Sequence, residues 1–185
     1  MLKDELVSHL ASRDYTPDSL GSILSKESGV IYFLLWNLSG QLVGFQQYIP
    51  NAPKSGNHPK DCRYYTYTTK VDSKSIPAIW GLHTYSLSTK RIFIVEGVFD
   101  AVKLHNIGEC AIALLGNAGS KSVKQWLSLI RAEKISILDS DQSSNALKRL
   151  SNRWYVTPSP YKDLGEMPQN KVDAFIKEIG VKKLE

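Results

Sequence analysis

The chain has 185 residues, of which 42% are hydrophobic and 10% aromatic, which is typical of a globular protein. This length allows one full core with a smaller appended lobe, which we favour, or a single large domain. No apolar run approaches the roughly 20 residues that a membrane helix needs, and the charged start lacks the apolar region of a secretory signal. We therefore expect a cytoplasmic protein without a membrane partner. The formal net charge of +5 is compatible with an anionic partner.

The cysteines give no sign of a metal or disulfide framework. Cys62 and Cys110 stand far apart, without the paired spacing of a zinc site. His58 and Cys62 supply only half of a zinc ligand set. We therefore expect no zinc site.

The first 50 residues combine helical and strand patterns. Leucine and valine at helical spacing predict a helical lead-in over residues 1–29, with a break and a restart of the helix at residues 15–20. Residues 31–36 and 41–49 then flank a short turn that contains Gly40, which is typical of a β-hairpin.

Residues 50–74 are polar and basic and carry three tyrosines. The basic residues are Lys54, Lys60, Arg63, Lys70 and Lys74, and the tyrosines are Tyr64, Tyr65 and Tyr67. Cations for phosphates and rings for base stacking are typical of a surface that binds single-stranded nucleic acid. The alternative is an edge strand over residues 63–69 whose tyrosines pack inward and whose charges are solvated. The pattern leaves both interpretations open.

From Arg91 onward, strand and helix patterns alternate with short connections. The expected strands are 91–95, 109–115, 134–138 and 153–157, and the expected helices are 98–106, 120–131, 143–151 and 170–179. This order predicts an α/β domain with a mostly parallel four-stranded sheet over residues 91–185. Residues 1–90 would form a smaller basic α+β lobe.

Acidic residues follow two of these expected strands. Glu96 and Asp100 come after strand 91–95, and Asp139 and Asp141 come after strand 134–138. Ligands of open α/β sheets bind beyond the carboxyl ends of the strands, where these acids would gather. Because Mg²⁺ prefers oxygen ligands, the sequence predicts a site for Mg²⁺ or Mn²⁺ there.

The motifs resemble a known catalytic domain. Residues 94–101 (IVEGVFDA), 115–118 (LGNA) and 138–141 (LDSD) occur in the order and on the β/α frame of the Toprim domain, which DnaG-type primases, topoisomerases and some nucleases share. The preceding part is similar to primases in the segment 38–45 and in Arg63-Tyr64, which stands 18 residues before Gly81-Leu82. The resemblance is to the catalytic core of a bacterial or phage DnaG-like primase, over roughly residues 30–180.

The resemblance implies a nucleotidyltransferase, a DNA-directed RNA polymerase that makes short RNA primers on single-stranded DNA from nucleoside triphosphates. It implies catalytic roles for Glu96, Asp139 and Asp141, a metal site formed by these three with Asp100 and Asp163, and nucleic-acid or nucleotide contacts from Lys60, Arg63, Lys74, Gly97 and Gly116. The alternative interpretations are helix capping for Asp139 and Asp141, an ordinary loop position for Asp163, and ordinary turn positions for the glycines.

The resemblance also implies partners and a location. These are the DNA template, a replicative helicase and a separate zinc-binding template-recognition subunit, since we expect no such domain in this chain. The cell would be a bacterium, or the bacterial host of a phage. The segment after Asp141 departs from the primase pattern of a small residue and glycine. A Toprim nuclease and a non-catalytic single-strand-binding subunit of the replisome are the alternatives.

Overall fold

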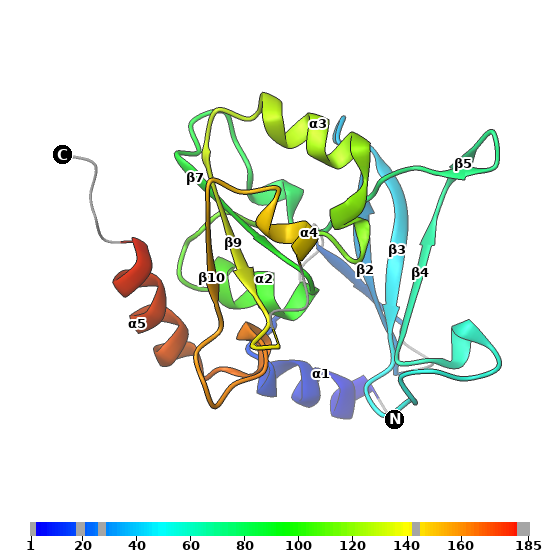
Figure 1. Ribbon diagram of the computed structural model, residues 1–185. Coiled ribbons are helices and arrows are strands. Elements are labelled where there is room, and N and C mark those ends of the chain that lie inside the picture. Colours follow the sequence, from blue (N-terminus) through cyan, green and yellow to red (C-terminus); the bar gives the residue numbers. More distant parts are fainter. Residues whose placement is uncertain (1–2, 18–20, 26–28, 142–144, 181–185) are drawn as a thin grey trace. The chain divides into compact units, whose positions relative to one another are not determined.

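The computed structural model describes residues 3–17, 21–25, 29–141 and 145–180 (Figure 1). The chain divides into two compact units, Met1–His83 and Thr84–Glu185. Among the described residues, no helix combines the length and apolar character that crossing a membrane requires.

The first unit is an antiparallel sheet with one helix and a small ribbon. Its elements are α1 (Lys3–Ser12), β1 (Ser22–Leu24), β2 (Ile31–Trp36), β3 (Leu42–Tyr48), β4 (Tyr64–Thr68), β5 (Lys70–Val71) and β6 (Lys74–Ser75). The strand order is β1-β2-β3-β4, and β5 pairs separately with β6. The expected hairpin is therefore present as β2 and β3.

One face of this sheet carries the core of the first unit. Ile31, Phe33 and Leu35 alternate along β2 and are fully buried, as is Leu6 of α1. The expected helical lead-in is right for α1 but wrong for residues 22–24, which form β1 and pair with β2. Pairing with the edge of β2 satisfies the backbone of this short segment, so tertiary contacts override the local pattern. Residues 18–20, which belong to the expected break and restart at 15–20, lie outside the described residues.

The second unit is a parallel sheet with helices. Its elements are β7 (Arg91–Val95), α2 (Val98–His105), β8 (Ala111–Ala113), α3 (Lys121–Leu129), β9 (Glu133–Leu138), α4 (Asn145–Lys148), β10 (Arg153–Val156) and α5 (Gln169–Gly180). The order is β10-β9-β7-β8 and every pairing is parallel, so β7 and β9 lie side by side in the middle (Figure 1). The expected α/β class with a four-stranded parallel sheet is confirmed.

Burial explains why the β7 strand was predictable. Ile92, Phe93, Ile94 and Val95 are all at most 1% exposed, so side chains on both faces of β7 are covered, as is usual in a parallel sheet. β8 is shorter than the expected strand 109–115, because the backbone turns away at Leu115. α4 is likewise shorter than the expected helix 143–151, whose residues 143 and 144 lie outside the described residues.

Candidate active site

Acidic side chains gather at the carboxyl ends of the two central strands. β7 ends at Val95 and β9 at Leu138, and the strands pair in parallel, so Glu96 and Asp139 leave neighbouring strands at the same edge. Burial, followed by the negative charges of Glu96, Asp163 and Asp141, raises the pKa of Asp139 to about 6, while the positive charge of Lys162 opposes the shift. Three other predicted acids therefore act electrostatically on Asp139.

A network of backbone contacts positions Asp163 beside the segment that follows β9. The amide of Ser140 donates to the carbonyl of Lys162 at 2.7 Å. Asp163 caps the 3₁₀ turn Leu164–Glu166, since its Oδ1 accepts a hydrogen bond from the Glu166 amide at 2.9 Å. Asp163 thus caps this turn. Its carboxylate also lies close enough to Asp139 to act on it electrostatically.

Asp100 is buried and joins two segments. Its Oδ2 accepts a hydrogen bond from the Gly97 amide at 3.0 Å, and its Oδ1 accepts one from the Gly165 amide at 2.8 Å. Burial, followed by the charges of Asp163 and Asp139, raises the pKa of Asp100 to about 7, although the two amides oppose the shift. Both carboxyl oxygens thus have partners in the protein, which makes Asp100 a positioning residue at the start of α2.

The two glycines predicted at phosphate-binding turns have different constraints. Gly97 has an extended φ of −111°, and a Cβ there would lie 3.0 Å from Asp100 Oδ2, so close approach of the carboxyl group favours glycine. Its amide already donates to Asp100. Gly116 has a φ of +86°, which L side chains rarely adopt, so its turn requires glycine.

The acidic cluster fits a divalent cation in its chemistry. In the described part of the chain, no three acidic, histidine or cysteine side chains converge closely enough to form a ready-made metal site. The available donors are carboxylate oxygens, which Mg²⁺ and Mn²⁺ accept while retaining several waters. Burial, followed by repulsion from neighbouring acids, raises the pKa values of Asp100 and Asp139, and a bound cation would offset the repulsion.

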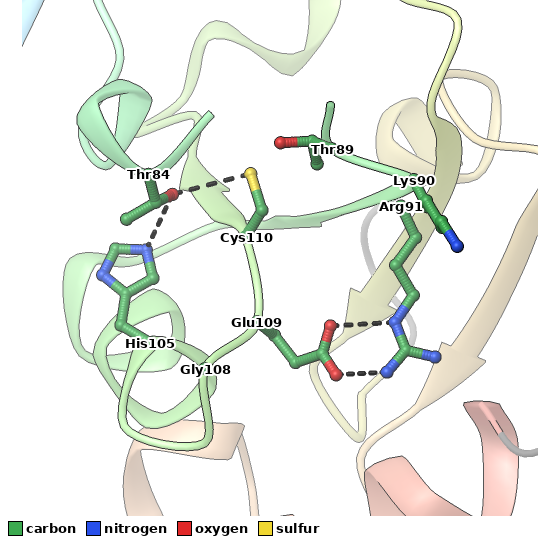
Figure 2. A pocket seen from close by; sticks show the side chains of 8 residues that line it. All are labelled: Thr84, Thr89, Lys90, Arg91, His105, Gly108, Glu109 and Cys110. Atoms are coloured by element: carbon green, nitrogen blue, oxygen red, sulfur yellow. Dashed lines mark hydrogen bonds and ion pairs between the residues drawn. The ribbon is translucent and has the colours of Figure 1, made fainter. Parts of the chain in front are cut away.

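The second unit also has a pocket at the other end of its sheet (Figure 2). Its volume is about 430 Å³, and its walls include the Arg91–Glu109 ion pair and the Cys110 thiol, which accepts a hydrogen bond from the Thr84 hydroxyl at 3.6 Å. Arg91 begins β7, whereas the acids follow the end of that strand. The pocket is therefore not part of the acidic cluster.

In the first unit, the predicted contact residue Arg63 lies in a basic cluster. Its Nε donates to the Ala52 carbonyl at 3.1 Å. Burial lowers the pKa of His9, and the positive charges of Arg13 and Arg63 lower it further. His9 forms a hydrogen bond of 2.9 Å with the Tyr48 hydroxyl. Arg13 and His9 were missed from the sequence because they precede Arg63 by about 50 residues, and only folding brings them together.

The other two predicted cations flank β4 rather than joining this cluster. Lys60 is exposed on the 3₁₀ turn Pro59–Asp61 before β4, and its carbonyl accepts a hydrogen bond from Gln47 Nε2 at 2.7 Å. Lys74 is exposed on β6, after β4. The three predicted cations are therefore spread along the strand.

Comparisons of sequence find no matching family model and no matching curated protein. Solved structures do match. The RNA polymerase domain of Mycobacterium tuberculosis primase DnaG matches with a TM-score of 0.60 at 16% identity, covering 95% of this chain and 62% of that chain. The primase fragment of the bacteriophage T7 primase-helicase protein matches with a TM-score of 0.53 at 18% identity, covering 80% and 62%. The chain has the fold of a primase catalytic core.

A further match extends the primase fold over nearly the whole chain. A DnaG primase catalytic domain bound to single-stranded DNA matches with a TM-score of 0.58 at 16% identity, covering 97% of this chain and 68% of that chain. The expected Toprim-type core preceded by an α+β lobe is thus confirmed as a fold. The chain spans about six tenths of the length of the first two primase structures named above.

Proposed function

We propose that the chain is the core of a DnaG-like DNA primase, a nucleotidyltransferase that makes short RNA primers on single-stranded DNA during replication. The observation that carries the proposal is the group of acids around Asp139, at the carboxyl ends of β7 and β9, within a primase core fold. Neither a nuclease nor a purely single-strand-binding role has an observation of its own in favour.

In this proposal Glu96, Asp139 and Asp141 hold Mg²⁺ or Mn²⁺, with Asp163 beside them. When bound, the cation supplies positive charge against the charge that develops on the phosphoryl oxygens and on the leaving group. Asp100 holds the start of α2 against the loop that carries Asp163, through its bonds to Gly97 and Gly165.

The reaction joins a primer 3′-hydroxyl to an incoming nucleoside triphosphate. A bond forms between the 3′-oxygen and the α-phosphorus, the bond from the α-phosphorus to the bridging oxygen breaks, and pyrophosphate leaves. Glu96 is only half-buried at the end of β7 and is our candidate base for the hydroxyl proton. Lys60, Arg63 and Lys74 contact phosphates of the template or the nucleotide, and Gly97 and Gly116 shape the turns beside the acids.

The proposed partners follow from the printed descriptions of the matched structures. One primase catalytic domain is bound to single-stranded DNA, and another match is part of a primase-helicase protein. We therefore infer a single-stranded DNA template, and a replicative helicase and a separate zinc-binding template-recognition subunit as partners. The setting is the cytoplasm of a bacterium, or of the host if a phage encodes the chain.

Primer synthesis by wild type and by an Asp139→Asn, Asp141→Asn double variant tests the proposal. Both are incubated with single-stranded DNA, labelled nucleoside triphosphates and Mg²⁺ or Mn²⁺, and products are separated on a sequencing gel. We expect short labelled RNA and pyrophosphate from wild type, and at least about 100-fold less from the variant. Asp173→Asn is the matched control, since Asp173 pairs with Lys177 on α5 at 2.6 Å and lies outside the cluster.

Other products would contradict the proposal in distinct ways. A shortened template that depends on Asp139 and Asp141 would show a nuclease. Template binding without any product, unchanged in the double variant, would show a single-strand-binding subunit. RNA made equally well by the double variant would mean that the acidic cluster is not the catalytic site.

A further inference from the structure

The sheet of the first unit has aromatic side chains on the face opposite its core. In the pairing register, Tyr32 lies opposite Gln47, which lies opposite Tyr65, while Phe45 lies opposite Tyr67. Because side chains alternate along strands, Tyr32 points away from the face of its buried neighbours in β2. We call Tyr32, Phe45, Tyr65 and Tyr67 the aromatic face.

The rings of the aromatic face form one connected group centred on Phe45. Tyr67 stacks on Phe45 with centroids 5.5 Å apart and an interplanar angle of 25°. Tyr32 meets Phe45 edge-on at 5.2 Å, and Tyr65 does so at 6.4 Å. Tyr64 belongs to the other face, since it lies opposite Tyr48, whose ring is 5.0 Å away.

The aromatic face is partly open to solvent. Tyr67 is 49% exposed, and Tyr32, Phe45 and Tyr65 are each half-buried. Rings that only completed a core would be covered on both sides. Here an exposed ring rests on a half-buried one, which leaves flat aromatic surface available for stacking.

The segments before and after β4 carry more positive than negative charge. Lys54 and Lys60 precede the strand together with Asp61, Lys70 and Lys74 follow it together with Asp72, and all six side chains are exposed. Phosphates of a strand laid along β4 would meet cations at either end, while its bases would meet rings between them. Rings flanked by cations match single-stranded nucleic acid better than an apolar protein partner.

We propose that the aromatic face is a stacking platform for unpaired bases of single-stranded DNA. This proposal rests on the proposed function for the identity of the ligand. It assigns the recognition of template bases to the aromatic face and not to the basic cluster around Arg63. Stacking accepts any base, so the platform would hold the template without selecting its sequence.

Binding of two oligonucleotides of equal length to the full chain tests this proposal. One probe is labelled oligothymidylate, and the other is a labelled abasic strand that keeps the phosphates but lacks bases. We expect Tyr67→Ala and Tyr65→Ala each to weaken oligothymidylate binding by about 5- to 100-fold and to leave the abasic strand unaffected. Tyr67→Phe should bind like wild type, because it keeps the ring.

Tyr64→Ala is the matched control. Tyr64 lies on the same strand and is 42% exposed, but it faces the other way. Its replacement should leave the ratio of the two affinities unchanged. Equal losses on both probes in Tyr67→Ala, or no loss on either, would overturn the platform. Thermal unfolding of each variant establishes that it is folded.

The platform and the primase proposal fail separately. Selective loss of oligothymidylate binding in Tyr67→Ala, without primer synthesis by wild type, would uphold the platform and refute the primase. Primer synthesis by wild type with unchanged oligothymidylate binding in Tyr65→Ala and Tyr67→Ala would do the reverse.

Discussion

Asp100 connects two segments that lie 65 residues apart in the chain, through bonds from the amides of Gly97 and Gly165. Its folded-state pKa of about 7 lies well above the ordinary 3.8, chiefly because the carboxyl group is buried. Between these values the folded protein keeps a proton that the unfolded chain has lost. Stability therefore falls as pH rises from about 4 to about 7, and the full penalty persists above that range.

We predict that the metal-free protein loses on the order of 4 kcal/mol of unfolding free energy over this pH range through Asp100. Asp100→Asn should flatten the pH dependence, although an amide group facing a backbone N–H lowers stability at pH 5 by roughly 1–3 kcal/mol. Urea unfolding at pH 5, 6, 7 and 8 measures both effects. Equal pH slopes for wild type and variant would contradict the prediction.

The pKa of Asp139 is raised like that of Asp100, and this affects cation binding. Burial and neighbouring acids raise its pKa to about 6, so protons compete with a cation below that pH. We predict that calorimetric titration with Mn²⁺ shows weaker binding at pH 5 than at pH 7.5. The Asp139→Asn, Asp141→Asn variant should bind weakly at both values, and wild-type affinity that does not change with pH would contradict this.

At the scale of elements, Gly44 permits the pairing of β3 with β4. A Cβ at this position would lie 2.1 Å from the carbonyl oxygen of Tyr67 and 3.0 Å from the Cα of Thr68. Both are backbone atoms, which cannot rotate away as a side chain would. The sheet of the first unit can therefore form with this spacing only if residue 44 lacks a side chain.

We predict that Gly44→Ala destabilises the protein by about 3 kcal/mol or more, because the two strands must separate locally. The change should appear as a lower midpoint of thermal unfolding. Gly56→Ala is the control, since its Cβ would meet only Cys62 Sγ at 3.7 Å, an ordinary contact. Similar midpoints for the two variants would show that β4 shifts at little cost.

The elements that the sequence predicted well are those whose pattern is local. β7 and β9 are apolar runs between charges, and such runs survive in a sheet that is covered on both faces. β1 could not be predicted, because three residues carry no period and become a strand only beside β2. The end of β8 depends on the left-handed backbone at Leu115, which no side-chain pattern indicates.

The candidate site was predictable in its acids but not in their surroundings. The order of the strands brings Glu96 and Asp139 to one edge of the sheet. The alternating β/α pattern of the sequence predicts this placement, because ligands of such sheets bind beyond the carboxyl ends of the strands. The bond from the Gly165 amide to Asp100 and the placement of Arg13 beside Arg63 depend on long-range packing. The roles of the predicted residues in binding and catalysis stay predictions.

At the scale of the whole molecule, the strands that the structure describes pair within their own unit. The parallel sheet of the second unit draws all its strands from residues 91–156, and the sheet of the first unit draws its strands from residues 22–68. Each unit also has its own buried side chains, such as Phe33 in the first and Phe93 in the second. Both features are those of units that fold as separate domains.

The order of the central strands also matters while the chain is being made. Glu96 and Asp100 emerge from the ribosome about 40 residues before Asp139, because β8 and α3 are translated between them. A nascent chain that stops short of β9 can pair β7 with β8 without gathering the acids. The repulsion of Glu96 and Asp141 on Asp139 thus arises only when β9 joins the sheet, after its neighbour β7 has had time to form.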